Sequence, residues 1–486
     1  MERIVIDPIT RLEGHGKISI FLDDKGEVAD AYFQVPELRG FETFCEGRPV
    51  EELPRIMTRI CGVCPEAHHM ASAKAVDAVF HVEPTPTGKQ LRELMYSAFF
   101  ASDHATHFYI LAGADFLVGP DAPVAKRNIF GLIDKVGEEI GRRVIRHRME
   151  CAEAIALIAG RQVHPVCALP GGVSKPLSEQ ERDRLEQIAR DAVKFGELSL
   201  QLFGDLVLTN PAYKDLILSP TYAQQTYYMG TVDEHNQVNF YDGDIRVVDP
   251  AGKQFARFRP SEYTDYLAER VEPWTYLKFP YLKGVGWKGF IPGPESGVYQ
   301  ATPLSRLNAA DGMATPLAQA AYENMYDTLG GKPVHLTLAT HWARLIEMLY
   351  AAERMLQLVQ DPQITNKDVR VIPSETPDEG VGVVEAPRGT LYHHYQTDSK
   401  GIVRKVNLIV GTTNNHAAIC MSIKRAAQGL ISADKPPTPG VLNMIEMAFR
   451  AYDPCLACAT HFLPGEMPLD LWVYDAQGKL LYRVTR

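Results

Sequence analysis

Two short cysteine motifs lie near opposite ends of the 486-residue chain. The first, RICGVCPEAHH, holds Cys61 and Cys64, and the second, DPCLACATH, holds Cys455 and Cys458. Each pair has the Cys-x-x-Cys spacing with which two thiolates bind one metal ion. Because the pairs are far apart in the sequence, they can serve a single metal centre only if the fold brings the two ends of the chain together.

Three kinds of chemistry suit these pairs. A structural zinc ion takes four thiolates, but its two pairs normally lie within about 15–20 residues of each other. A redox dithiol is expected in a thioredoxin-like βαβ pattern, which neither pair has. Soft thiolates also favour nickel or iron and can bridge two ions. The spacing alone leaves zinc and a redox-active metal centre open.

Composition narrows the class of protein. The formal net charge of −10 and the pI of about 5.9 argue against a nucleic-acid surface, and no basic run interleaved with aromatic residues opposes this. No apolar stretch reaches the roughly 18 residues of a membrane span, and MERIVIDPIT lacks the features of a secretory signal. Eight cysteines are too few for a disulfide scaffold, so we expect a cytoplasmic protein with reduced thiols. Core packing is the expected role of the other four, which are Cys45, Cys151, Cys167 and Cys420.

The elements that must position the cysteines are mostly helical. Residues 17–35 alternate apolar and polar side chains around a turn at 23–26, which predicts a β-hairpin. Helical patterns follow at 87–118, at 137–160, from a capping box of Ser178 and Glu181 onward, and at 335–360. The apolar stripes expected to face the core are Ile145, Met149, Ala152, Ile155 and Ala156; Leu185, Ile188, Ala192 and Phe195; and Trp342, Leu345, Ile346, Leu349 and Ala352.

The predicted fold class is mainly α (α+β), with a central bundle of long helices and small peripheral β-sheets. Residues 1–36 form the β-hairpin region, and residues 86–205 and 335–360 supply the long helices. Residues 209–315, rich in Gly, Pro and Tyr, are predicted as an irregular and β-rich insertion. No sharp boundary divides the chain, so we predict a single domain over residues 1–461. Residues 470–484 have the pattern of a strand, a turn and a second strand.

Three further stretches accompany the cysteine motifs: DPITRLEGHGKI at 7–18, SDHATHFYILAGADF at 102–116 and EAPRGTLYHHY at 385–395. Together, and in this order, the five resemble the signatures of the large subunit of nickel–iron hydrogenases. RGFETFCEGRPVEELPRI at 39–56 resembles the cytosolic, multimeric class, which is NAD-reducing or linked to a heterodisulfide reductase. The resemblance implies the large-subunit fold of that family and the reversible cleavage of H2 to protons and electrons.

The resemblance also implies a set of metal ligands. All four cysteines would bind nickel, and Cys64 and Cys458 would bridge to an iron that carries two cyanides and one carbon monoxide. Cys458 would pass a proton to the relay carboxylate, which matches Glu13 in RLEGH. A magnesium ion would be bound by Glu42, by the backbone carbonyl of Leu408 and by His461.

Other site residues follow from the same resemblance. Arg388 matches the arginine above the open metal site, and its permanent charge would provide a fixed positive field. The remaining matches are Asp115 and Asp453, which would pair with Arg388; Pro387, which would shape the pocket around the diatomic ligands; Thr412, which would hydrogen-bond a cyanide; and His68, which would donate to a cysteine sulfur. Gly411 stands where proline is usual, so Thr413 remains an alternative to Thr412.

The resemblance implies partners as well. The chain has no ferredoxin-like cysteine run and no G-x-G-x-x-G fingerprint after a strand, so electrons would leave through a small subunit with iron–sulfur clusters. Further subunits of diaphorase or heterodisulfide-reductase type would follow, and a deazaflavin acceptor is a less favoured alternative. Residues 462–486 would be a propeptide that a maturation endopeptidase removes after His461, with strands that pair with each other or with a nearby sheet edge.

Two other functions stay open at this point. One is a non-catalytic scaffold stabilised by zinc, and the other is a subunit like the quinone-reducing one of respiratory complex I. Relatives of the second kind generally lack the four cysteines. Elemental analysis separates the first from a hydrogenase, because equal amounts of nickel and iron support the hydrogenase and zinc alone supports the scaffold.

Overall fold

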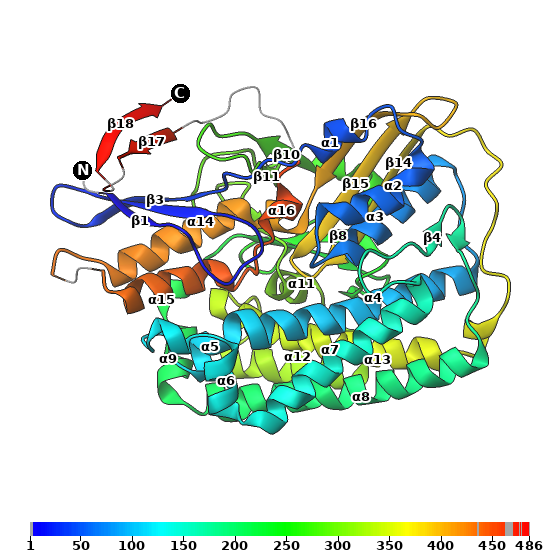
Figure 1. The fold of residues 1–486 in the computed structure, drawn as a ribbon, viewed down its shortest axis with the longest axis horizontal. Helices are drawn as coiled ribbons and strands as arrows, with labels where there is room; N and C mark the ends of the chain where they lie inside the picture. The colour runs from blue at the N-terminus through cyan, green and yellow to red at the C-terminus, as the bar shows by residue number, and fades with distance from the viewer. Residues whose placement is uncertain (1–2, 435–436, 462–469, 476, 478, 486) are drawn as a thin grey trace.

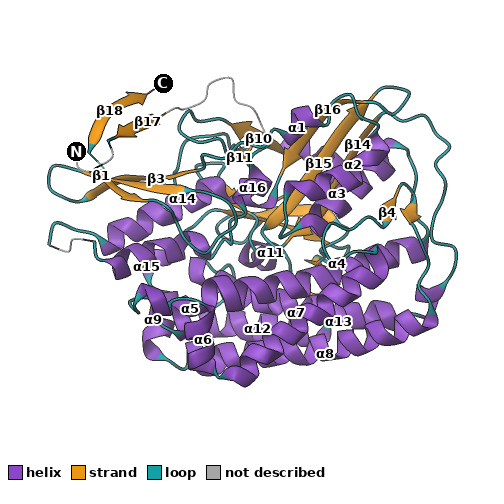
Figure 2. Ribbon diagram, in the orientation of Figure 1, coloured by secondary structure: helices purple, strands orange, loops and turns teal. Residues whose placement is uncertain are grey.

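The computed structural model describes residues 3–434, 437–461, 470–475, 477 and 479–485. Five long helices form one layer, at the bottom of Figures 1 and 2. The central helix α13 packs against α8, α4 and α12, while α7 packs against α4 and α8. The five are α4 (Pro86–Thr106), α7 (Glu138–Ala159), α8 (Glu179–Phe203), α12 (Pro316–Leu329) and α13 (Thr340–Gln360). The predicted class, a helical bundle with small sheets, is confirmed.

Most helix signals in the sequence act as expected. Ser178 and Glu181 form a complete capping box at the start of α8, and the predicted stripe of α8 is buried. The pattern at 87–118 is one helical stretch with a change of winding, because α4 passes into a π-helical segment (His107–Ala112) and then into α5 (Gly113–Leu117). A π-helical segment within a helix often marks a functional site.

The predicted core stripe of α7 is wrong in part. Ile145 is 57% exposed and Met149 is 66% exposed. The buried positions of this helix are instead Val144, His147, Cys151, Ala154, Ile155, Ile158 and Ala159. α7 therefore has two apolar stripes, and the one that faces the bundle is offset from the predicted one.

Small sheets cover the other side of the bundle. One three-stranded sheet has the order β1-β2-β3 and another the order β14-β15-β16. Residues 209–315 contribute most of a six-stranded sheet in which β6 is central. The strands of these sheets are β1 (Arg3–Ile6), β2 (Lys17–Leu22), β3 (Val28–Gln34), β6 (Tyr227–Val232), β7 (Gln237–Val238), β8 (Asp244–Val248), β9 (Gln254–Phe258), β12 (Tyr299–Gln300), β13 (Gly312–Met313), β14 (Glu379–Ala386), β15 (Gly389–Thr397) and β16 (Val403–Ile409). The predicted hairpin of residues 17–35 is confirmed as β2 and β3.

Three two-stranded sheets complete the β-structure. They are β4 (Ala168–Leu169) with β5 (Gly172–Val173), β10 (Leu267–Arg270) with β11 (Phe279–Leu282), and β17 (Asp470–Tyr474) with β18 (Leu480–Thr485). The last pair confirms the strand, turn and strand expected at the end of the sequence. Residues 462–469, between His461 and β17, lie outside the described residues.

The sheet β14-β15-β16 fixes one half of the site. Helix α3 (Pro65–Val79) packs on β14 and β15. A Cβ atom added at Gly382 would come within 2.1 Å of the Ala71 carbonyl oxygen, and one at Gly380 within 2.4 Å of the Ala75 carbonyl oxygen. Glycine therefore lets the strand backbone contact the helix backbone directly. This contact places the start of α3 beside the turn that follows β14.

The other half of the site comes from the C-terminal helices. A large apolar core contains all four motif cysteines, and a second core lies between the β1-β2-β3 sheet and helices α14 (Gly411–Leu430) and α15 (Pro439–Arg450). The shorter helices are α1 (Phe41–Phe44), α2 (Leu53–Ile56), α6 (Ile129–Val136), α9 (Pro211–Leu218), α10 (Tyr263–Tyr266), α11 (Pro303–Ala309) and α16 (Leu456–Ala459). Across the described residues, none of the helices combines the length and the apolar character that a membrane span requires.

Candidate metal centre

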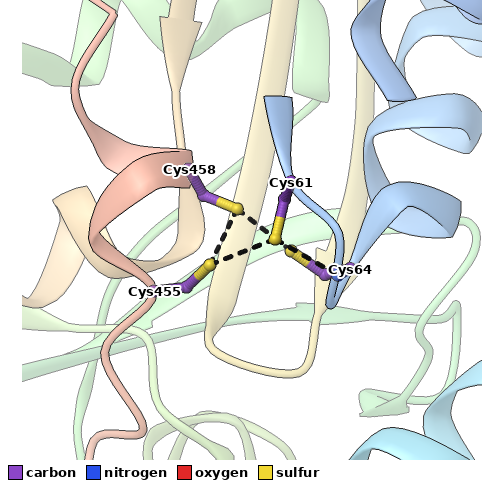
Figure 3. Close-up of side chains that lie close together, drawn as sticks. All are labelled: Cys61, Cys64, Cys455 and Cys458. Atoms are coloured by element: carbon purple, nitrogen blue, oxygen red, sulfur yellow. Dashed lines mark hydrogen bonds between the residues drawn. The ribbon is translucent and has the colours of Figure 1, made fainter. Parts of the chain in front are cut away.

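The four motif cysteines converge on one buried point (Figure 3). Their Sγ atoms all lie within 4.8 Å of one another. The distances are 3.4 Å from Cys61 to Cys455, 3.1 Å from Cys64 to Cys458 and 2.8 Å from Cys455 to Cys458. Among the described residues this is the one group of at least three His, Cys, Asp or Glu side chains arranged to hold a metal ion. The predicted convergence of the two ends of the chain is confirmed.

Each pair lies at the N-terminus of a helix. Cys64 is the N-cap of α3, with Pro65 as its first residue, and Cys455 is the N-cap of α16. The amides of Val63 and Cys64 donate to the Cys61 sulfur, at 3.2 and 3.4 Å. Helix N-termini and amide donors both stabilise negative charge. The local backbone therefore favours thiolates, the form in which cysteine binds metals.

Protons are shared unequally within the tetrad. Hydrogen bonds from Cys455, Cys458 and Cys64 lower the pKa of Cys61 far below its usual range. Burial raises the pKa of Cys455 and of Cys458 well above the ordinary thiol value. One thiolate surrounded by three thiols is the favoured state of these side chains, and a cation in their midst would take the place of the shared protons.

Glu13 contacts the tetrad through Cys455. Its backbone forms a parallel bridge with Cys455, and its Oε2 accepts from the Cys455 sulfur at 3.0 Å and from the Ala457 amide at 3.1 Å. Gly14, at φ +88°, lets the two segments approach, since a Cβ there would lie 2.8 Å from the Leu456 Cβ. Burial, followed by the negative charge of Cys61, raises the pKa of Glu13. The prediction that Cys458 passes a proton to Glu13 is corrected, because Cys455 holds that position.

Arg388 lies in the turn after β14 and forms two ion pairs. Its Nη1 lies 3.1 Å from Asp103 Oδ2, and its Nη2 lies 3.0 Å from Asp453 Oδ2. The predicted pair with Asp453 is therefore observed, but the predicted pair with Asp115 is wrong. Asp115 instead pairs with Arg11 and with Arg450, each at 2.5 Å. Burial raises the pKa of Asp103 and of Asp453, and the Arg388 guanidinium acts against that rise.

A small cavity of about 250 Å³ adjoins the sulfur atoms. Its lining includes Cys64, Cys455 and Cys458, Arg388 and Thr412, together with His68, Ala67, Ala386, Leu391, Val410 and Gly411. Thr412 Oγ1 accepts from the Cys455 amide at 2.9 Å, so the hydroxyl proton of Thr412 remains free to donate. Thr413 donates to the Ala459 carbonyl at 3.4 Å and does not line the cavity. The structure thus favours Thr412 over Thr413 for the predicted contact.

Two other predicted cavity residues have different surroundings. Pro387 is buried but absent from the lining, where its neighbours Ala386 and Arg388 lie. His68 Nδ1 lies 3.1 Å from His393 Nε2, and His68 Nε2 has no partner within the described part of the chain. The predicted donation from His68 to a cysteine sulfur is therefore not observed, although its unpaired nitrogen belongs to a side chain that lines the cavity.

The three residues predicted to bind magnesium are only partly arranged for it. Glu42 Oε1 accepts from the amide of Leu408 at 2.9 Å, rather than sharing a cation with the Leu408 carbonyl. The ammonium of Lys278 lies 3.6 Å from Glu42 Oε1. His461 is buried, with its Nε2 in contact with the Cys458 carbonyl and its Nδ1 unpaired among the described residues. A cationic side chain thus already faces Glu42, and the magnesium site stays a prediction.

Comparison with known proteins decides between the metals. A family model described as "Nickel-dependent hydrogenase" matches residues 39–126 and 143–461, and one described as "HoxL-like" matches residues 3–38. The chain belongs to the nickel-dependent hydrogenase family. It is 50% identical over 481 residues to an "F420-non-reducing hydrogenase iron-sulfur subunit" of Archaeoglobus profundus, covering 99% of both chains. It is 38% identical over 494 residues to "NAD-reducing hydrogenase HoxS subunit beta" of Cupriavidus necator, covering 99% of this chain and 98% of that one.

Solved structures agree with this assignment. A crystal structure of an NAD+-reducing [NiFe]-hydrogenase in the H2-reduced state superposes with a TM-score of 0.89 at 38% identity, covering 95% of this chain and all of that one. The hydrogenase is therefore a nickel–iron enzyme of the large-subunit type, and the scaffold and complex-I-like alternatives are set aside. A donor set of four buried sulfurs is chemically suited to nickel and iron.

Proposed function

We propose that this hydrogenase subunit cleaves H2 heterolytically and reversibly at a nickel–iron centre bound by all four cysteines. Cys61 and Cys455 are terminal ligands of nickel, and Cys64 and Cys458 bridge to an iron with two cyanides and one carbon monoxide. The observation that carries this proposal is the convergence of four Sγ atoms within 4.8 Å beside a cavity lined by Arg388 and Thr412. Both bridging cysteines line that cavity, whereas Cys61 does not.

The side chains around the sulfurs have separate tasks. When bound, the nickel–iron group supplies the redox-active Lewis acid at which hydrogen is polarised. Glu13 takes up a proton at Oε2, which lies 3.0 Å from the Cys455 sulfur, within the reach of a general base. The guanidinium of Arg388 keeps its charge at any working pH and is held by two carboxylates. Thr412 offers its hydroxyl proton to a cyanide, and the unpaired Nε2 of His68 donates to a cysteine sulfur.

Electrons leave through a partner that holds iron–sulfur clusters. The loop between the first two cysteines is the accessible edge of the tetrad, since Val63 is 40% exposed while Cys61 is 3% exposed. We propose that a small subunit docks over this loop. The relatives are named as NAD-reducing and F420-non-reducing hydrogenases, and NAD or a heterodisulfide reductase is accordingly the proposed acceptor system, reached through further subunits in the cytoplasm.

Two maturation features complete the proposal. A magnesium ion binds at Glu42, the Leu408 carbonyl and His461 once the Lys278 ammonium moves aside. An endopeptidase then removes residues 462–486 after His461, whose buried position beside Cys458 would couple cleavage to metal loading.

Metal analysis of the purified enzyme tests the central claim. Nickel and iron in equal amounts, infrared bands of cyanide and carbon monoxide, and H2-dependent reduction of a viologen dye are expected together. Cys64→Ser should remove iron and activity, whereas Cys151→Ser, at a buried cysteine outside the tetrad, should leave both intact. Zinc as the only metal, or full activity in Cys64→Ser, would overturn the proposal.

A further inference from the structure

Helix α7 presents an apolar stripe to the outside of the molecule. Ile145 and Met149 lie one turn apart on α7 and are more than half exposed. They line a groove with about 1230 Å³ of open space, together with Arg142, Arg146, Glu153 and Arg184. We call this surface the α7 groove. An exposed apolar stripe bordered by charged residues is typical of an interaction site.

The charge of the α7 groove is opposite in sign to that of the chain as a whole. Four exposed arginines lie within seven residues of α7, at 142, 143, 146 and 148, in a chain with a formal net charge of −10. Arg142 pairs with Glu138, but both side chains are 74% exposed, so that pair contributes little. Arg143, Arg146 and Arg148 make no ion pair within the described residues. Positive charge is therefore available for a partner.

We propose that the α7 groove binds an acidic amphipathic helix of another subunit of the same enzyme. The apolar side of that helix covers Ile145 and Met149, and its carboxylates pair with Arg143 and Arg146 at the border. This proposal rests on the proposed function only in treating the chain as one subunit of a larger complex. It concerns a surface of the helical layer, whereas the electron exit proposed above lies at the loop around Val63.

Two observations favour this occupant over others. A second copy of the chain on a two-fold axis would bring α7 arginines against α7 arginines, which repel. The groove is concave, which suits a helix better than the flat surface of a membrane. The family model also skips residues 127–142, which form α6 and the start of α7. A surface beside a segment outside the common family pattern suits a subunit that only part of the family has.

Photo-crosslinking in the intact complex tests the proposal. The photoreactive residue p-benzoylphenylalanine replaces Met149, and in a control it replaces Ile372, which is 69% exposed elsewhere. The expected product from position 149 alone is a peptide of another subunit with Leu, Ile, Met or Phe at helical spacing between Asp and Glu. A product with a second copy of the chain, with lipid, with a non-acidic peptide or with nothing would each overturn the proposal.

Charge reversal gives a second measurement. The double variant Arg143→Glu with Arg146→Glu should speed release of the crosslinked subunit tenfold or more at low salt, followed by native mass spectrometry. The control is Arg259→Glu with Arg404→Glu, which makes the same charge change at arginines that are 74% and 64% exposed. Equal release rates in both double variants would contradict the proposal. Hydrogen-dependent viologen reduction should persist in both, so that failure here is distinct from failure of the proposed function.

Discussion

Arg306 is the side chain through which the fold holds Arg388 in place. It is fully buried on α11, and its Nε and Nη2 lie 2.6 Å from the two oxygens of Glu347. Its Nη1 lies 3.1 Å from Glu385 Oε2 and donates to the Ala386 carbonyl at 2.9 Å. Its Nη2 also donates to the Pro387 carbonyl at 3.3 Å. The guanidinium therefore fixes the backbone directly before Arg388, and Arg306 is a positioning residue.

Removal of this guanidinium should affect both stability and turnover. Arg306→Met leaves two fully buried carboxylates without their cation, a change that typically costs about 3–5 kcal/mol. Unfolding entropy of about 2.1 cal/mol/K per residue converts this loss to about 3–5 °C in Tm for a chain of 486 residues. A displacement of Arg388 by about 1 Å would lower kcat by about 10–100-fold. Arg306→Lys keeps the charge but not the fork, so intermediate values are expected.

The assay is H2-dependent viologen reduction, measured beside thermal unfolding and nickel and iron content. Arg354→Met is the matched control, because Arg354 also forms a two-pronged pair with a glutamate, Glu93, at 2.6 and 3.1 Å, but is 33% exposed. The control should lose little in either measurement. Loss of stability in Arg306→Met with kcat within twofold of the wild type, at unchanged metal content, would refute the positioning role.

Three further changes test other parts of the site and fold. Burial lowers the pKa of His69 to about 4, so the unfolded chain binds a proton below about pH 6.5 that the folded chain refuses; stability should therefore fall by about 3 kcal/mol between pH 6.5 and 4, and His69→Gln, unlike the exposed control His235→Gln, should flatten the profile of urea unfolding against pH. Thr412→Val should shift a cyanide infrared band and Thr412→Ser should restore it; an unchanged band would argue against this contact. Glu13→Gln should lower kcat by about 10²–10⁴-fold with metal content retained, and a rate within twofold of the wild type would exclude a proton relay there.

The tetrad could be predicted from the sequence, but its surroundings only in part. The cysteine pairs are recognisable because thiolate ligands at this spacing are uncommon without a metal. The carboxylates near Arg388 are harder, since Asp103 and Asp115 both lie in the motif at 102–116 and both are buried. Twelve residues of helix span about 18 Å, so only one of them can reach Arg388, and the spacing does not tell which. The presence of Asp at 103, directly after Ser102 in that motif, was the available signal for the correct residue.

Helix α7 shows a second limit of sequence reasoning. Its positions 144, 151, 155 and 158 form one apolar stripe and its positions 145 and 149 extend another, so a helical period fits both. Periodicity identifies a stripe but does not tell whether the bundle or a partner covers it. The positioning roles of Arg306 and His393 were also missed, because each acts through contacts with residues distant in sequence.

The charges around the tetrad indicate how metal binding must be balanced. Two buried guanidinium groups, Arg388 and Arg344, lie beside two buried carboxylates, Asp103 and Asp453, so their formal charges cancel. No surplus positive charge from these four groups is left for the sulfur atoms. Four thiolates in this interior consequently need either protons or metal cations, and metal binding must release protons. Uptake of nickel and iron by the apoprotein should therefore weaken as the pH falls, with protons released in step with the metals; metal uptake without proton release would contradict this charge balance.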